Sequence, residues 1–242
     1  MHTSWTTPDE GYEQAVAHFV NAILEPSDKN RFLPDFLSFQ ARIAAYGSLQ
    51  SLSQTLLRLT TPGIPDTYQG TELWDFSLVD PDNRRPVDFV LRHELLQQVN
   101  ARPLPELIDK WKDGGIKLYL IQKVLQYRKT HPDLFLAGDY IPCYASGPKS
   151  KHILAFARRW SSEWVLAIAP RLTVGLAPAG SPPALTGRVW RDTELSIPED
   201  APRRWTNILT GESLNVSDVN TVQVRSVLHR FPVALLASSS AE

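Results

Sequence analysis

The segment from residue 60 to residue 88 constrains the fold more than any other part of the sequence, because it ends a helical pattern and begins a long polar loop. Leucines at helical spacing lead up to Pro62 and Gly63, where proline lacks the backbone N–H and glycine tolerates a positive φ. Residues 64–69 predict one short strand that ends at Gly70. The loop beyond Gly70 is dense in Asp, Asn, Arg and Trp, and a loop of that kind on a strand end favours ligand binding.

Apolar residues at helical spacing predict helices on both sides of this segment. Pro8-Asp9-Glu10 is a favourable helix start, because acidic side chains stabilise the positive end of the helix dipole. Gly47-Ser48 marks a position where the second helix can kink, and Pro132 ends the last helix. The expected helices cover residues 10–24, 34–59, 89–99, 106–112 and 116–130.

The texture of the sequence changes near residue 135, where short runs rich in β-formers alternate with turn residues. The expected strands cover residues 140–144, 152–158, 164–169, 188–191, 221–224 and 233–236. Regular short strands of this kind predict an antiparallel β-sandwich. The expected fold class is therefore α+β, with a mostly helical domain over residues 1–134 and an antiparallel β domain over residues 135–242. Residues 177–184, rich in Pro, Gly and Ala, predict a surface loop.

Composition excludes several classes of function. The formal net charge of −1 argues against electrostatic capture of nucleic acid or of an anionic membrane. A single cysteine, Cys143, excludes an internal disulfide and favours a reducing compartment, and no apolar run reaches membrane-spanning length. We therefore expect a cytoplasmic protein. The sequence has no phosphate loop, zinc spacing or nucleophile elbow, so neither a cofactor nor a metal is expected.

The run Pro-Gly-Ile-Pro-Asp-Thr-Tyr-Gln-Gly-Thr-Glu, residues 62–72, resembles the last barrel strand of the α-amylase clan of glycoside hydrolases. The longer run Tyr-Gln-Gly-Thr-Glu-Leu-Trp-Asp-Phe-Ser-Leu-Val-Asp-Pro-Asp-Asn-Arg-Arg-Pro-Val-Asp, residues 68–88, is similar to one family of that clan, the maltooligosyltrehalose synthases. The resemblance extends over nearly the whole chain, but only to the C-terminal part of that family. It implies the end of a catalytic (β/α)8 barrel, with its last helices and last strand, followed by an antiparallel domain.

The resemblance also implies an activity. The family performs intramolecular transglucosylation in trehalose biosynthesis, converting the reducing-end α-1,4 bond of a maltooligosaccharide into an α,α-1,1 bond. The implied partners are a maltooligosaccharide substrate and the N-terminal barrel portion. Separately, the exposed strand edge and apolar helix faces of a partial barrel favour a homo-oligomer through exposed barrel surfaces. The alternative function is a non-catalytic carbohydrate-binding or interaction module.

The catalytic carboxylates of the clan have no counterpart in this sequence. Retaining glycosidases use a carboxylate nucleophile and a carboxylic acid as general acid and base. The family's Asn-His-Asp and Gly-x-Arg-x-Asp motifs are both absent from the chain. We therefore assign no catalytic residue here, expect the catalytic carboxylates to lie upstream of Met1, and expect the chain by itself to be inactive.

Candidate substrate-binding residues remain in the central loop. Aromatic rings can stack on a sugar, and carboxylate, amide and guanidinium groups can hydrogen-bond its hydroxyls. The alternatives are that the charged residues pair with one another, that Glu72 braces the loop, and that Tyr68 packs in the core. The adjacent pair Arg158-Arg159 is expected on a solvated surface. The candidate sugar-binding residues are Tyr68, Glu72, Trp74, Asp80, Asp82, Asn83, Arg84 and Arg85.

Overall fold

The computed structural model describes residues 2–176 and 187–238, which belong to two compact units, Met1–Ala45 and Tyr46–Glu242. The first unit contains helix α1 (Glu10–Leu24) and the beginning of helix α2 (Phe32–Thr60), while the rest of α2 belongs to the second unit. The loop expected over residues 177–184 lies outside the described residues. Within the described ranges, no helix combines the length and the apolar character needed to cross a membrane.

The helices agree with the apolar spacing of the sequence. Helix α1 begins at Glu10, within the expected start, and Asp9 caps it, because Asp9 Oδ1 accepts a hydrogen bond from Tyr12 N at 3.0 Å. Helix α2 runs without interruption through Gly47-Ser48, and a further short helix begins at Pro132. The remaining helices are α3 (Phe89–Ala101), α4 (Leu104–Asp109), α5 (Gly115–Thr130), α6 (Pro132–Leu136) and α7 (Val224–Val227).

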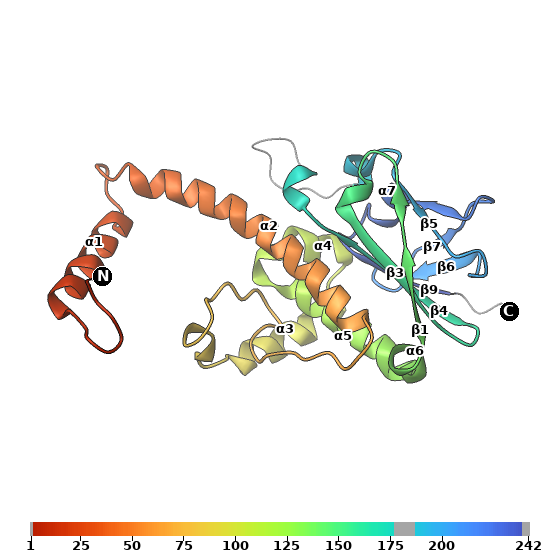
Figure 1. The fold of residues 1–242 in the computed structure, drawn as a ribbon, viewed down its shortest axis with the longest axis horizontal. Helices are drawn as coiled ribbons and strands as arrows, with labels where there is room; N and C mark the ends of the chain where they lie inside the picture. The colour runs from red at the N-terminus through yellow and green to blue at the C-terminus, as the bar shows by residue number, and fades with distance from the viewer. Residues whose placement is uncertain (1, 177–186, 239–242) are drawn as a thin grey trace. The chain divides into compact units, whose positions relative to one another are not determined.

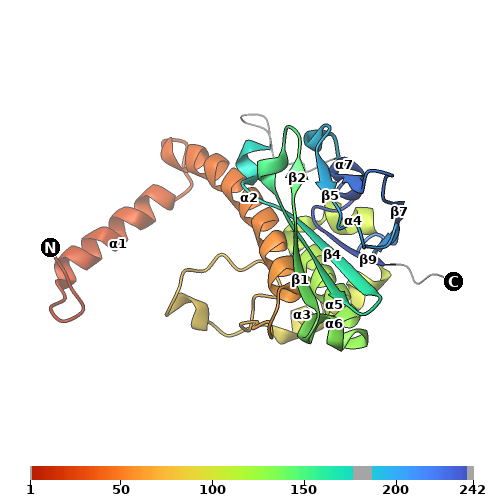
Figure 2. The same ribbon diagram turned by 45° about the vertical axis from the view of Figure 1, so that its right-hand side comes forward.

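Two antiparallel sheets make up the C-terminal part of the second unit (Figures 1 and 2). The larger sheet has the strand order β1-β3-β4-β9-β6-β7 and the smaller has the order β2-β5-β8. The strands are β1 (Asp139–Cys143), β2 (Ala145–Ser146), β3 (Ile153–Trp160), β4 (Glu163–Pro170), β5 (Glu194–Ser196), β6 (Arg204–Asn207), β7 (Ser213–Asn215), β8 (Thr221–Gln223) and β9 (Ala234–Ser238).

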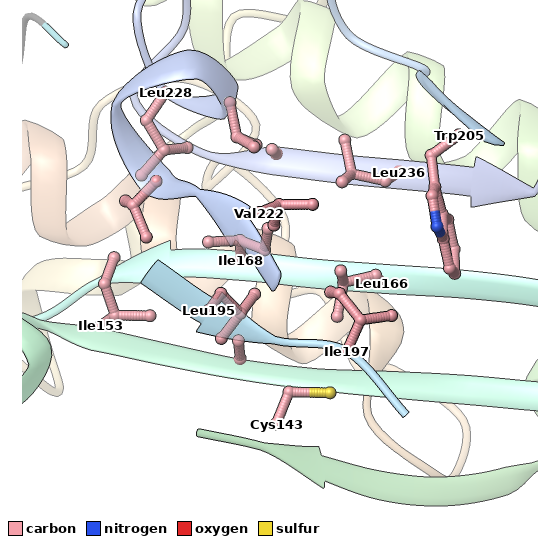
Figure 3. Close-up of a cluster of buried hydrophobic side chains, with 14 of the residues drawn as sticks. Cys143, Ile153, Leu166, Ile168, Leu195, Ile197, Trp205, Val222, Leu228 and Leu236 are labelled. Carbon is pink, nitrogen blue, oxygen red and sulfur yellow. The ribbon is translucent and has the colours of Figure 1, made fainter. Parts of the chain in front are cut away.

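The large sheet is buried on both faces, because successive side chains of a strand point to opposite sides. Leu166 and Ile168 of β4 point to one face, where they share a cluster with Leu195 of β5 and Val222 of β8 from the small sheet (Figure 3). The intervening β4 residues point to the other face and pack against α2, α5 and α6. This two-sided burial explains the continuous apolar run in the middle of β4.

The helical face of the sheet joins the helices and the strands in one core. Leu56 of α2 and Leu120 of α5 are fully buried and cluster with Val165 of β4 and Leu235 of β9. Over the residues that the structure describes, the fold is therefore α+β, with six α-helices before two antiparallel sheets. The domain boundary expected between residues 134 and 135 stays a prediction, although helices and strands from its two sides share this cluster.

Two expected strands are corrected by the structure. Residues 64–69 have no strand structure, because a single strand of a parallel barrel has no neighbour among the described residues with which to form a ladder. Residues 188–191 were expected to be a strand, but Gly187–Trp190 forms a 3-10 helix. The Trp190 side chain at the end of this helix is fully buried.

The expectation of a solvated Arg158 is also wrong. Arg158 is only 1% exposed, and its guanidinium group donates hydrogen bonds to four main-chain carbonyl oxygens. Arg158 Nη1 donates at 3.2 Å to the carbonyl oxygen of Thr60, the last residue of α2. The other three acceptors are the carbonyl oxygens of Phe135, Gly138 and Asp139. Arg128 adds a bond from its Nη1 to Leu59 O at 2.7 Å. Two arginines therefore fix the end of α2 at the point where the central loop begins.

Candidate functional site

A polar hollow of about 600 Å³ lies between the second half of α2, the central loop and the start of α5. Its size falls within the range of small-molecule sites, roughly 300–1,000 Å³. The hollow belongs entirely to the second compact unit. Its lining includes the side chains of Arg58, Asp66, Tyr68, Asp75, Asn83 and Lys117.

Lys117 is the buried cation of the hollow. It is 6% exposed, although it is charged at neutral pH, and its Nζ donates a hydrogen bond to Leu73 O at 3.0 Å. Burial, followed by the repulsion of the Arg58 guanidinium, lowers the pKa of Lys117 to about 8. The carboxylates of Asp75 and Glu72 act in the opposite direction. A lysine that is desolvated beside a hollow, with a lowered pKa, is typical of a functional site.

Asp75 supplies a negative charge beside Lys117. Its Oδ1 accepts hydrogen bonds from Ser77 Oγ at 2.6 Å and from Ser77 N at 2.9 Å. These bonds, the side-chain one first, lower the pKa of Asp75 below its ordinary value, so that the group is a carboxylate at neutral pH. The hollow therefore contains fixed charges of both signs, with Arg58 and Asp66 adding one of each.

Glu72 and Trp74 lie beneath the loop and hold it to neighbouring helices. Glu72 Oε2 accepts hydrogen bonds from Gly70 N at 3.0 Å and from Arg92 Nε at 2.9 Å. Trp74 Nε1 donates to Trp111 O at 2.6 Å, and the half-buried ring packs against the helical core. These contacts correspond to the bracing alternative for Glu72. A sugar contact of either side chain stays a prediction.

The charged residues at the tip of the loop form exposed pairs. Arg84 binds Asp80 through two nitrogen–oxygen contacts, one of them 2.6 Å from Nη2 to Oδ2. Arg85 binds Asp82 through one contact of 3.2 Å from Nη2 to Oδ1, and its side chain is 75% exposed. The pairing alternative therefore holds in this structure for both arginines, while their contact with sugar stays a prediction.

The structure brings together only part of the candidate set. Tyr68, which is half-exposed, and Asn83 line the hollow. Within the described residues, Asn83 Oδ1 is buried without a hydrogen-bond donor. Sequence reasoning missed Arg58, Asp66, Asp75 and Lys117, which also line it. The available signal for Lys117 was its place as the one charged residue within the apolar run at the start of α5.

The sequence and the fold were then compared with those of known proteins. No protein-family model matches the sequence. Two curated relatives, from Mycobacterium tuberculosis strains CDC 1551 / Oshkosh and H37Rv, are provisionally described as maltooligosyl trehalose synthase. Each is 35% identical over 210 residues, which is 87% of this chain and 23% of the relative.

Solved structures give a likeness over almost the whole chain. The maltooligosyltrehalose synthase from Arthrobacter ramosus is 33% identical with a TM-score of 0.76, covering 98% of this chain and 28% of that chain. An α-amylase from Anoxybacillus is 18% identical with a TM-score of 0.50, covering 96% of this chain and 41% of that one, which is a likeness of fold alone.

These findings first give the chain a fold that is shared with portions of the α-amylases and of the maltooligosyltrehalose synthases. Among these proteins, the chain is a homologue of the maltooligosyltrehalose synthases and corresponds to a portion of them. It spans about a quarter of the length of the relatives that it matches.

Proposed function

We propose that this chain is a C-terminal portion of a maltooligosyltrehalose synthase and supplies the rim of its glucan-binding cleft. The observation that carries the proposal is the 33% identity to the Arthrobacter ramosus enzyme across 98% of this chain. The polar hollow beside the loop supports it, since the hollow offers donors, acceptors and an aromatic ring to a hydroxyl-rich ligand.

The proposed reaction is a transfer within one oligosaccharide. A carboxylate attacks the anomeric carbon of the penultimate glucose, and the α-1,4 bond breaks as a carboxylic acid protonates the leaving oxygen. The anomeric hydroxyl oxygen of the released glucose then attacks the glycosyl-enzyme and passes its proton to the carboxylate that served as the acid, which forms the α,α-1,1 bond and frees the nucleophile. Water takes no part, so the net change is an isomerisation.

The two carboxyl groups of that reaction come, in this proposal, from another portion of the enzyme. The chain contains neither of the family's carboxylate motifs. Incubation of the chain with maltopentaose, followed by a mass balance of the products, tests this point. We expect no trehalose-terminated product, and such a product from this chain by itself would refute the proposal.

The proposed macromolecular partner is the portion that supplies those carboxyl groups. Helix α1 has no buried residue, and its large apolar side chains Val16, Phe19 and Val20 are exposed. The first half of α2 similarly exposes Phe36 and Phe39. Exposed apolar surface of this extent favours association. The barrel portion is the proposed occupant, and a second copy of the chain takes its place in its absence.

A non-catalytic carbohydrate-binding module is the second candidate. The observation that favours it is the presence of the hollow in a chain without the catalytic motifs. Maltopentaose titrated into the chain with and without the barrel portion separates the two functions. A module binds glucan equally well in both experiments, whereas a portion of the enzyme binds more tightly once the cleft is complete.

A further inference from the structure

Lys117 has hydrogen-bond donors that the surrounding protein does not pair, as expected of a group that binds a ligand. An ammonium group carries three N–H donors. Among the described residues, Nζ has one hydrogen-bond acceptor, Leu73 O, lies 6.0 Å from the centroid of the Trp74 ring and forms no ion pair. A desolvated cation that lacks acceptors costs free energy, and that cost falls when a ligand supplies them.

The acceptors and the charges around Lys117 define what kind of ligand fits. Asp75 Oδ1 accepts from Ser77, and no described donor contacts Asp75 Oδ2. Asn83 Oδ1 is buried without a donor within the described ranges. The hollow therefore presents a donor, Lys117 Nζ, and an unused acceptor, Asp75 Oδ2, while the Oδ1 atom of the lining residue Asn83 is buried. An alcohol, which both donates and accepts, can pair with this donor and this acceptor.

The balance of charge excludes strongly ionic ligands. Arg58 and Lys117 are cationic, while Asp66 and Asp75 are anionic, and all four line the hollow. An anion would face both carboxylates and a cation would face both cations, so electrostatics favours a neutral polyol. The ring of Tyr68, 48% exposed, offers a face on which a pyranose can stack.

We propose that the hollow binds one glucose unit of an α-1,4-glucan, with Lys117 Nζ donating to a sugar oxygen and Asp75 Oδ2 accepting from a sugar hydroxyl. This inference rests on the proposed function, because that function names the glucan. It adds a subsite and two residues that the sequence did not single out.

Calorimetric titration of maltopentaose into the full chain at pH 6.5 tests the subsite. Lys117→Met removes the donor and keeps an apolar stem of similar length, and we expect it to weaken binding about tenfold to hundredfold, the loss of one charged hydrogen bond. Lys129→Met is the matched control, since Lys129 is an exposed residue of the same helix outside the hollow, and we expect unchanged affinity. Thermal unfolding of both variants shows that each is folded.

A second readout separates ligand contact from a purely structural role. Raising the pH from 6.5 to 9.5 deprotonates Lys117, whose charge responds to Arg58, Glu72 and Asp75 around it. We expect several-fold weaker maltopentaose binding at pH 9.5 in the native chain and no such change in Lys117→Met. Absence of maltopentaose binding, equal affinity of Lys117→Met, or a pH dependence retained by Lys117→Met would each overturn the inference.

Inorganic phosphate is the anionic probe, and the predicted result is no binding. Phosphate binding that Lys117→Met abolishes would overturn the choice of a neutral ligand. The proposed function fails by a different result, namely absence of transglucosylation when the chain completes a catalytic barrel. Lys117-dependent binding of maltopentaose would survive that failure and assign the chain to the carbohydrate-binding class.

Discussion

Arg158 is the residue whose replacement should destabilise the second unit most clearly. Its guanidinium group donates hydrogen bonds of 2.8–3.2 Å to carbonyl oxygens of Thr60, Phe135, Gly138 and Asp139. Arg158→Met keeps a long apolar stem but removes every donor, leaving these acceptors without their partner. An unsatisfied buried polar group costs about 1–3 kcal/mol, and removal of the buried cation itself returns part of that sum. We expect a net loss on the order of 3 kcal/mol, because four carbonyl acceptors lose a charged donor while no charge is left behind.

Arg159 provides the matched control for this experiment. It is the next residue of β3 and points to the opposite side, where its partly exposed guanidinium contacts Asp139 at 2.8 Å and Asp200 at 2.5 Å. Exposed pairs of this kind contribute little to stability, so Arg159→Met should shift the unfolding midpoint much less than Arg158→Met.

Urea unfolding of the full chain measures both effects as shifts of the transition midpoint at an unchanged m-value. Native domains have only about 5–15 kcal/mol of stability, so the Arg158 effect is large on that scale. If Arg158→Met loses no more stability than Arg159→Met, the hydrogen-bonded anchor at the end of α2 does not stabilise the fold as argued.

Three further predictions follow from exposed and buried charges and from the apolar helices. The pKa of Lys117 is about 8 in the folded chain against 10.5 ordinarily, so between these pH values the unfolded chain binds more protons than the folded chain. The free energy of unfolding of the native chain, relative to that of Lys117→Met, should therefore rise by up to about 3 kcal/mol from pH 8 to pH 10.5. A difference that stays constant with pH in urea unfolding would contradict this. In an enzyme completed with a catalytic barrel, Arg85→Ala should lower kcat/KM about tenfold to hundredfold, because the single contact of Arg85 with Asp82 leaves donors for sugar. Arg84→Ala should lower only the melting temperature, and Asp80→Ala should lower it to the same extent. An unchanged kcat/KM in Arg85→Ala would remove Arg85 from the site. The isolated chain should self-associate and bind a hydrophobic dye through Phe19, Phe36 and Phe39, so a strict monomer by light scattering with no dye binding would count against an exposed interface.

Local signals in the sequence predicted most helices and the long strands. The cap at Asp9 and the apolar spacing of α5 are properties of short segments, and so is the apolar run of β4. The short strands β5, β6 and β7 escaped prediction, because three or four residues carry too little pattern and their pairing is decided by distant neighbours. The expected strand over residues 64–69 failed for the same reason, since local preference cannot provide a pairing partner.

The candidate site was predictable only in part. The loop composition led to Tyr68 and Asn83, which line the hollow, and to the alternating charges that form exposed pairs. The burial of Arg158 was not predictable, and that of Lys117 was indicated only by the apolar run around it, because a basic residue on a helix or strand is ordinarily solvated. Their burial depends on segments that approach from far along the chain, 44 residues away for Leu73 and 98 residues away for Thr60. Sequence patterns do not contain such contacts.

One measurement tests the central claim most directly. The segment of the Arthrobacter ramosus enzyme that matches this chain is replaced by residues 1–242, and the chimera is incubated with maltopentaose. If the chain is an equivalent portion of a maltooligosyltrehalose synthase, NMR of the product shows an α,α-1,1 linkage and no net release of glucose. A folded chimera that only hydrolyses maltopentaose, or leaves it unchanged, would contradict the claim.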